Sequence, residues 1–506
     1  MKKNVFILSA MLIFISGVLP SCEKFLDKQP INLPTDANFW KNEAEAVSSV
    51  AGAYALLRTA LSEKGMAYYY YGDFATDEFA SGIPGEDLAS LGNIQWNTFI
   101  PSTETFRALI RMRSWDNFYR SIDQANRCIK FIPGIPLDKF TSANKQATKD
   151  ALIAEAYFIR AFNYFFMSRV WGDVSLVIET VEDAAKAPNL PRTPQEEVLQ
   201  QCIQDLELAI SKMVWAPPSA SRAIRVSKGA AYALLAHIYA WKGEYDKVIP
   251  AADSVILNGG YTYVNRATSA GYLSIYKGNS SEGIFEIAKN ATNEASAGAG
   301  IVDPNIAIKT LKAPYLATNL GNSILTLDAI SLGALFPDAA DYRRANGFAF
   351  WGTTDPITIK YSNIIYTGAN NTSPLVLTNI IVFRLADIVL LKAEALAATG
   401  NFGEARTVLD GIRALSNATA STATDDELFA AVIEERAREL FLEGHRFYDL
   451  VRLAKKTGIL KFNGSGAVIR MDDLQFEQGK YYWPLDPIII NANPLLEQTP
   501  YWRDKM

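Results

Sequence analysis

The densest group of ionisable residues lies in residues 434–452, which read EERARELFLEGHRFYDLVR. Three glutamates of this segment, Glu435, Glu439 and Glu443, repeat every four residues, a spacing that places side chains on one face of a helix. Glycoside hydrolysis requires two carboxyl groups across the scissile bond. The segment therefore offers the side chains of a hydrolytic site, and a glycoside hydrolase is one hypothesis for its chemistry.

The same segment also supplies partners for these carboxylates. Glu443 and Arg446 are three residues apart, as are Asp449 and Arg452, and this spacing brings opposite charges together on a helix. Apolar residues fill the other side of the pattern, which Gly444 interrupts, so the helix is expected to pack against the body of the protein. We therefore interpret the glutamates as a structural ion-pair network in preference to an active site.

The composition argues against several classes of function. The 506 residues are 49% hydrophobic and 20% charged, as in ordinary globular proteins, and the net charge of −5 without basic runs disfavours nucleic-acid binding. The chain has two histidines, His237 and His445, and three cysteines, which nearly excludes the common zinc sites. It also lacks the motifs of nucleophile elbows, CxxC pairs and phosphate-binding loops. We expect no catalysis and no cofactor, and leave a structural calcium ion open.

Residues 1–21 have the pattern of a secretory leader. Lys2 and Lys3 precede an apolar run at 5–19, which is shorter than the roughly 20 residues that a membrane-spanning helix needs. A small residue directly before Cys22 is similar to a bacterial lipobox, so we expect cleavage at this point and lipidation of Cys22. Several acyl chains would hold the protein stably on a membrane. The alternative is a secreted protein in which Cys22 is free or disulfide-bonded.

Residues 42–260 show the apolar spacing of three and four that is typical of amphipathic helices. Four long helices are predicted there before the first of two repeats. The third has an aromatic stripe, which we interpret as core and not as a binding platform. The stripe consists of Phe158, Phe162, Phe165 and Phe166.

An internal repeat indicates the architecture. Residues 230–257 align without gaps onto residues 387–414, and each copy reads as two short helices joined at a glycine, Gly243 in the first and Gly400 in the second. Small residues on the first helix of each copy allow close approach of the second, as in tetratricopeptide pairs. The predicted fold is mainly all-α, with tetratricopeptide-like helix pairs that form a scaffold.

The remaining segments complete the expected organisation. Helical periodicity fades over residues 261–380, which we expect to be a loop-rich ligand-binding insert with short strands. Residues 22–260 form an N-terminal helical region, and residues 381–506 hold the second repeat and a proline-interrupted tail at 481–502 that wraps the body. Residues 22–506 are expected to be one compact unit.

Ligand binding without catalysis requires aromatic faces for flat parts of the ligand and amide or acidic side chains for its polar groups. Tyr276 and Trp351 in the insert are candidates. Tyr70 belongs to a run of four tyrosines that precedes several acidic residues and could form a rim. These acidic residues are Asp73, Asp77 and Glu78.

The chain resembles the SusD/RagB family of Bacteroidetes outer-membrane lipoproteins. An ER run, an EL step, EG, an aromatic residue and D-L-x-R recur there in the order seen in residues 434–452. The tail is also similar to the family ending, in which N-P-x-L-x-Q precedes a final aromatic residue, although Thr499 stands where glycine or asparagine is commoner. The resemblance extends from Cys22 to Trp502.

This resemblance implies a helical fold of four tetratricopeptide-like units with a loop-rich subdomain that carries the ligand site. It also implies a cell-surface lipoprotein that captures oligosaccharide and delivers it to a SusC-like TonB-dependent outer-membrane transporter, over which it sits as a lid. One branch of the family serves peptide import, so capture of oligopeptides is the alternative. A glycoside hydrolase is a remote alternative, since the resemblance implies no catalysis.

In the family, one ligand aromatic comes from the loop before the second helix. Trp96, with Asn93 and Asn97 beside it, matches that position. The ligand residues expected from the resemblance and from the residue types together are Trp96, Asn97, Tyr70, Tyr276 and Trp351.

Overall fold

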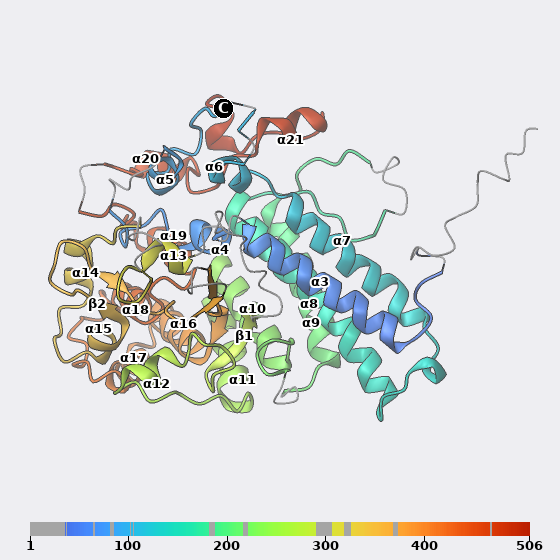
Figure 1. Ribbon diagram of the computed structural model, residues 1–506, viewed down its shortest axis with the longest axis horizontal. Coiled ribbons are helices and arrows are strands. Elements are labelled where there is room, and N and C mark those ends of the chain that lie inside the picture. The colour runs from blue at the N-terminus through green and yellow to red at the C-terminus, as the bar shows by residue number, and fades with distance from the viewer. Residues whose placement is uncertain are drawn as a thin grey trace, which may run out of the picture. The chain divides into compact units, whose positions relative to one another are not determined.

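Four long helices from the first half of the chain lie side by side in the computed structural model (Figure 1). The first begins where the sequence predicts, because the Asn42 side chain accepts a hydrogen bond from the backbone N–H of Glu45 at 3.1 Å and so caps the helix. Successive helices of the group contact one another, and the first also contacts the third. They are α3 (Glu43–Leu61), α7 (Asp116–Phe131), α8 (Lys145–Trp171) and α9 (Gln195–Lys212).

Residues 42–506 form one compact unit, and the fold described below is the fold of that unit. Residues 1–41 form a separate unit, of which little is described beyond a hydrogen bond from Trp40 Nε1 to Asp36 Oδ1 at 3.3 Å. The expected leader and Cys22 lie outside the described residues. The structure describes residues 36, 38–63, 66–80, 86–101, 103–104, 106–181, 188–215, 221–289, 306–317, 325–367, 373–465 and 468–506.

The internal repeat forms two helix pairs, as predicted. The glycines that join the helices, Gly243 and Gly400, have φ angles of +75° and +81°, which glycine adopts without a steric penalty. The two pairs pack against each other, since α11 of the first pair contacts α16 of the second. The first pair is α10 (Lys228–Lys242) and α11 (Tyr245–Asn258), and the second is α16 (Leu385–Ala398) and α17 (Phe402–Leu415).

The insert contains short strands and short helices, which confirms the predicted loop-rich subdomain. Its largest ladder is antiparallel and places Phe285 of one strand opposite Phe383 of the other, and both rings contact the aromatic stripe of α8. The strands pair as β1 (Gly283–Ile287) with β6 (Ile380–Arg384), β2 (Phe348–Ala349) with β3 (Ile357–Thr358), and β4 (Ile364–Thr367) with β5 (Ser373–Val376). The helices are α12 (Ser269–Leu273), α13 (Ile306–Thr310), α14 (Ala329–Leu335) and α15 (Tyr342–Gly347).

The tail runs back onto the helical body, as predicted. The backbone N–H of Trp483 donates to the carbonyl oxygen of Val170 in α8 at 2.7 Å, and the Trp483 and Trp502 rings are buried. Figure 1 shows the short helices α5, α6, α20 and α21 near the C-terminus, at the top of the view. The elements not yet given are α4 (Ala67–Gly72), α5 (Glu86–Gly92), α6 (Ala108–Met112), η2 (Ile132–Gly134), η3 (Leu137–Lys139), α18 (Leu428–Glu439), α19 (Arg446–Thr457), α20 (Asp473–Glu477), α21 (Pro487–Ala492) and η8 (Pro500–Trp502).

One large core spans most of these elements, and a small second cluster consists of Tyr272, Ile275, Tyr276 and Ile381. All four phenylalanines of the α8 stripe are at most 1% exposed, which confirms that the stripe is core. Cys128 and Cys202 are buried free thiols. Within the described ranges, every helix is too short or too polar to cross a membrane.

Candidate functional site

Residues 434–452, called the signature segment from here on, form the end of α18, a turn and the start of α19. The single helix expected from the sequence is therefore wrong. Leu442 and Gly444 have φ angles of +55° and +84°, which end the right-handed helix. A Cβ atom at Gly444 would lie 2.1 Å from the Tyr68 ring, and one at Gly72 would lie 2.2 Å from the Gly444 carbonyl oxygen. Two glycines thus allow α4 and the turn to touch.

Glu439 is surrounded by three arginines in the interior. Its carboxylate lies 2.6 Å from Arg266, 2.7 Å from Arg384 and 3.0 Å from Arg343, and none of these side chains is more than 1% exposed. Burial alone would raise the pKa of Glu439, but the three guanidinium groups outweigh it and hold that pKa well below its usual value. Glu439 is therefore ionised and enclosed.

Glu435 and Glu443 have similar surroundings. Glu435 pairs with Arg343 at 2.7 Å and with Arg413 at 2.6 Å, and these charges with that of Arg438 overcome its burial and lower its pKa to about 2. Glu443 pairs with Arg384 at 2.7 Å and with Lys360 at 2.9 Å. Its pKa is likewise lowered against the effect of burial.

The two pairs predicted from spacing have different outcomes. Asp449 and Arg452 form the expected ion pair at 2.7 Å. The predicted pair of Glu443 with Arg446 does not form, because the turn at Gly444 separates these two side chains. Arg446 instead bonds Asp77 at 2.6 Å.

The signature segment is therefore a structural ion-pair network, as interpreted from the sequence. Its three stacked glutamates are at most 2% exposed and each is held by two or more cations. A hydrolytic acid must hold a proton near neutral pH and must reach the glycosidic oxygen. The lowered pKa values and the burial oppose both requirements, so the hydrolase hypothesis loses the residues that suggested it.

Trp96 lies in the core and not on a ligand surface. It is 1% exposed, and its ring stacks on Trp483 with 4.0 Å between ring centroids and 12° between the ring planes. Its Nε1 atom donates to the carbonyl oxygen of Leu91 at 3.0 Å. The prediction that Trp96 contacts a sugar is therefore wrong, because its ring stacks on Trp483 and its Nε1 atom is hydrogen-bonded within the protein.

Asn97 is exposed, and its Nδ2 atom donates to the carbonyl oxygen of Lys505 at 3.2 Å. The amide thus ties its loop to the C-terminus. The ring of this loop that faces solvent is Phe99, which is 85% exposed and which the sequence reasoning did not single out.

Tyr70 and Tyr276 are also buried. Tyr70 packs edge-on against Phe74, with 5.4 Å between ring centroids, and Tyr276 donates from its hydroxyl to Glu443 at 3.0 Å. Both positions differ from the expected ligand surface. Tyr276 instead contributes to the ion-pair network of the signature segment.

Trp351 remains accessible. It is half-buried in the turn between β2 and β3, where its ring packs edge-on against Phe348 and the Arg344 guanidinium lies 4.7 Å from its centroid. Phe350 beside it is 39% exposed, and the ammonium group of Lys312 lies 4.3 Å from its ring centroid. We call Phe350, Trp351, Arg344 and Lys312 the hairpin surface. The adjacent aromatic pair before Gly352 was the sequence signal for Phe350.

Phe350 also has a strained backbone. Its φ of +56° lies in the left-handed region, which a bulky side chain adopts only when its surroundings impose it. Such strain concentrates at functional positions. The turn therefore presents two adjacent aromatic side chains to solvent in an enforced geometry.

The expected acidic rim borders a cavity of about 400 Å³ beside the signature segment. Asp77 and Glu78 line it together with Glu434 and Lys461. Glu78 is 4% exposed, and neither of its carboxylate oxygens has a hydrogen-bond partner. Burial and the neighbouring Asp73 raise the pKa of Glu78 well above its usual value, so it is the least satisfied carboxyl group of this rim.

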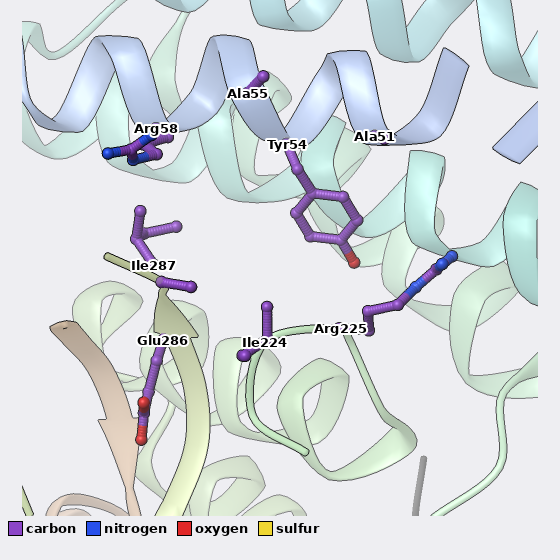
Figure 2. Close-up of a pocket in the computed structure, with 9 residues that line it drawn as sticks. Ala51, Tyr54, Ala55, Arg58, Ile224, Arg225, Glu286 and Ile287 are labelled. Atoms are coloured by element: carbon purple, nitrogen blue, oxygen red, sulfur yellow. The ribbon is translucent and has the colours of Figure 1, made fainter. Parts of the chain in front are cut away.

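A second cavity of about 350 Å³ lies between α3 and the end of β1. Figure 2 shows Tyr54 and Arg58 on the α3 side, with Ile287 and Ile224 facing them, while the Glu286 carboxylate is turned away. The Tyr54 hydroxyl donates to Glu155 at 2.7 Å, which fixes the ring. This cavity is mainly apolar.

Comparisons with known proteins identify the family. A family model described as "SusD family" matches residues 330–502, and one described as "Starch-binding associating with outer membrane" matches residues 24–240. SusD-like protein P38 of Formosa agariphila is 30% identical over 99% of this chain and 100% of the relative. The chain belongs to the SusD family.

Other SusD relatives and solved structures agree. A SusD-like protein of Bacteroides ovatus is 25% identical over 94% of this chain and 90% of its own. Starch-binding protein SusD of Bacteroides thetaiotaomicron is 34% identical over 23% of this chain and 20% of its own. The crystal structure of a SusD homolog from the same species has a TM-score of 0.78 and 27% identity, and covers 92% of this chain and 99% of that one.

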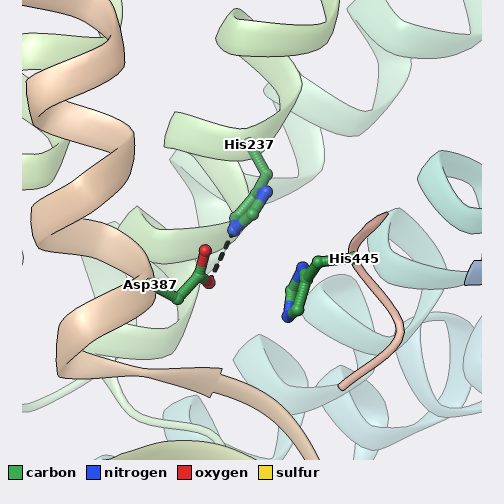
Figure 3. Close-up of side chains that lie close together, drawn as sticks. All are labelled: His237, Asp387 and His445. Carbon is green, nitrogen blue, oxygen red and sulfur yellow. Dashed lines mark hydrogen bonds and ion pairs between the residues drawn. The ribbon is translucent and has the colours of Figure 1, made fainter. Parts of the chain in front are cut away.

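The buried histidines of this SusD-family chain belong to a cluster that joins its two repeats. His237 of α10 bonds Asp387 of α16 at 2.8 Å, and His445 lies beside them in the signature turn (Figure 3). Burial and the nearby Arg436 lower the pKa of His445 to about 4, although Asp387 opposes the shift. Burial likewise lowers the pKa of His237. Both rings are therefore neutral at pH 7.

This cluster is the one group of three potential metal ligands among the described residues. Its donor set of two imidazoles and one carboxylate does not suit calcium, which prefers oxygen ligands. Arg436 already bonds the second Asp387 oxygen at 2.9 Å and brings its own positive charge. The arrangement fits an interhelical hydrogen-bonded cluster better than a metal site.

Proposed function

We propose that the protein binds glycans at the cell surface and delivers them to a SusC-like TonB-dependent transporter in the outer membrane. Membership of the SusD family is the observation that carries this proposal. One relative is named a starch-binding protein, and one matching family model is described as starch-binding and associated with the outer membrane. Lipidation of Cys22 is the proposed anchor, and the proposed role is capture and transfer without catalysis.

The hairpin surface is the proposed contact with the sugar. Pyranose rings present apolar C–H faces that pack against exposed aromatic side chains, while their hydroxyl groups need hydrogen-bond partners. Phe350 and Trp351 supply rings at one turn, and Arg344 and Lys312 supply donors directly beside them. Asp355, which holds the Lys312 ammonium group, adds an acceptor.

Isothermal titration of the purified chain against plant, host and microbial oligosaccharides tests glycan binding directly. We expect saturable binding to one class of glycan and its loss in Trp351→Ala. The matched control is Trp215→Ala, because Trp215 is also half-buried and also contacts another ring, that of Tyr232, but lies outside the hairpin surface. No binding to any oligosaccharide of the panel, or equal affinity of Trp351→Ala and the natural chain, would count against the proposal.

Purification from outer membranes tests the partner and the anchor. We expect a TonB-dependent transporter to co-purify with the natural chain, and Cys22→Ser to release the protein from the membrane fraction. Mass spectrometry of the purified complex reports the cargo. Bound peptides in place of glycans would replace the proposal with oligopeptide capture.

A further inference from the structure

Arg344 of the hairpin surface presents a guanidinium group whose N–H groups are all unused. It forms no hydrogen bond and no ion pair within the described part of the chain, and it lies over the Trp351 ring, 4.7 Å from the ring centroid. The side chain is half-buried, and none of its nitrogen atoms is among the buried polar atoms that lack a partner. A ligand in solution can therefore reach these donors.

The carboxylates nearest to Arg344 in the sequence bind other groups. One of them neutralises Lys312, the second cation of the hairpin surface, at 2.5 Å. Lys312 therefore differs from Arg344, whose charge remains open to a ligand. The three carboxylates are those of Asp338, bonded to Thr419, Asp341, bonded to Arg343, and Asp355, bonded to Lys312.

Trp351 also has an accessible donor. Its Nε1 atom has no hydrogen-bond partner among the residues that the structure describes, and it is not one of the buried polar atoms. The Nε1 atoms of Trp96 and Trp502 differ in this respect, because both donate to backbone carbonyl oxygens. An indole N–H donates and does not accept, so a ligand beside Trp351 must supply an acceptor.

The contact with Trp351 holds the guanidinium group in place. A guanidinium group over an indole ring is attracted to the ring, and a side chain that is already held loses less freedom when a ligand binds. The turn that carries Trp351 is itself constrained, since the φ angle of Phe350 is +56°. An arginine that is only solvated would have neither constraint. The donors of Arg344 are therefore positioned before a ligand arrives.

The chemistry of a guanidinium group favours one class of ligand. Its N–H groups form a planar fork that matches two oxygen atoms of a carboxylate or a sulfate group. Hydrogen bonds with charge on both partners are roughly twice as strong as those between neutral groups. The hydroxyl groups of a neutral sugar can accept from the fork, but they bring no negative charge.

We propose that the hairpin surface binds acidic glycans, with the carboxylate of a uronic acid or a sulfate ester on the Arg344 fork. The Trp351 N–H is a further donor to the ligand, and Phe350, which is 39% exposed, packs against an adjoining sugar ring. This inference rests on the proposed function, because it names the class of glycan that the same surface takes.

The experiment compares acidic oligosaccharides with their own neutralised forms by isothermal titration of the purified chain at constant ionic strength. Oligogalacturonates are paired with their carboxyl-reduced forms, and carrageenan and chondroitin sulfate oligosaccharides with their desulfated forms. Neutral malto-, xylo- and manno-oligosaccharides complete the panel. We expect at least one acidic ligand to bind about tenfold more tightly than its neutralised form. The pair that shows the difference reports whether the anion is a carboxylate or a sulfate.

The outcomes separate this inference from the proposed function. Binding of neutral oligosaccharides, with no acidic ligand tighter than its neutralised form, would overturn the acidic class and leave glycan capture in place. Absence of binding across the whole panel would count against glycan capture, and the inference would fall with it. Both comparisons use the natural chain, so they do not depend on the folding of any variant.

Three variants assign the preference to the fork. Arg344→Gln removes the charge and is expected to reduce the tenfold ratio of affinities to less than twofold, whereas Arg344→Lys keeps the charge without the fork and should retain about threefold. The matched control is Arg120→Gln, because Arg120 of α7 is exposed and also lacks a partner in the described ranges. That variant should retain the full ratio. Equal losses in Arg344→Gln and Arg120→Gln, or an undiminished ratio in Arg344→Lys, would overturn the assigned contact.

Discussion

Arg384 and Glu439 form an ion pair of 2.7 Å at a point where neither side chain is more than 1% exposed. Arg384 is the last residue of β6, and Glu439 is the last residue of α18. The same guanidinium also bonds Glu282 beside β1 and Glu443 in the signature turn. One side chain thus fastens the insert to the signature segment, and the stability of both depends on it.

Replacement of Arg384 by Met is expected to destabilise the fold strongly. The change leaves Glu439, Glu443 and Glu282 short of a cation in a buried site, and removal of one partner of a buried pair costs about 3–5 kcal/mol. Urea unfolding followed by circular dichroism measures the loss. Arg503→Met is the control, because its pair with Glu497 is exposed and is worth at most about 1 kcal/mol. Similar midpoints for the two variants would contradict the role given to Arg384.

Acid is expected to weaken the fold through Glu435. Its pKa is about 2 in the folded state, compared with 4.5 for an unperturbed glutamate. Because the folded-state pKa is depressed, the stabilisation is complete above pH 4.5 and is lost as the pH falls toward 2, with a total of about 3 kcal/mol. Free energies of unfolding measured between pH 2 and 6 test this slope. Glu435→Gln should have a lower stability at pH 6 and a flatter dependence, and an unchanged slope in this variant would refute the assignment.

Gly444→Ala is expected to prevent the native turn. The new Cβ atom would lie 2.1 Å from the Tyr68 ring at a φ of +84°, so it combines a steric clash with an unfavourable backbone conformation, and a loss of at least about 3 kcal/mol follows. Gly411→Ala in α17 is the matched control, since its Cβ atom would meet nothing within 4 Å. That variant should gain roughly 0.5–1 kcal/mol from reduced backbone freedom in the unfolded state. Thermal unfolding of both variants decides the question.

Trp96→Ala is expected to change stability and not ligand recognition. Removal of a fully buried tryptophan leaves a cavity beside Trp483 and costs about 3–5 kcal/mol. Trp351→Ala should show the opposite behaviour, with a small change in the urea midpoint and a large loss of glycan affinity. A folded Trp96→Ala protein that has lost binding while it keeps its stability would return Trp96 to the ligand site.

Periodic patterns predicted the helices well because apolar spacing depends on neighbours along the chain. The α8 stripe and the two repeats with Gly243 and Gly400 follow from such local patterns, whereas the partners of the signature glutamates, such as Arg266 and Arg384, lie far away in the sequence. Trp96, Tyr70 and Tyr276 could not be placed in this way, because an aromatic side chain serves equally well in a core or on a surface. The burial of Trp96 depends on Trp483, which lies almost 400 positions away, and Tyr276 bonds Glu443, which lies 167 positions away. The partner of Arg446 could not be predicted for the same reason. The turn at Gly444 directs Arg446 to Asp77, which is also far away in the sequence.

The charge network of the signature segment also constrains the order in which the chain can fold. Arg266, Arg343 and Arg384 reach their carboxylate partner Glu439 only after synthesis has entered the last sixth of the polypeptide. Until then, Arg343 has Asp341 as a partner, and Arg266 and Arg384 share Glu282, so burial of the three guanidinium groups would leave one positive charge uncompensated and would cost several kcal/mol. A polypeptide that ends before this point is expected to remain open and to be degraded by proteases. The ion pairs therefore make folding of the earlier segments depend on synthesis of the signature segment, in addition to stabilising the finished fold.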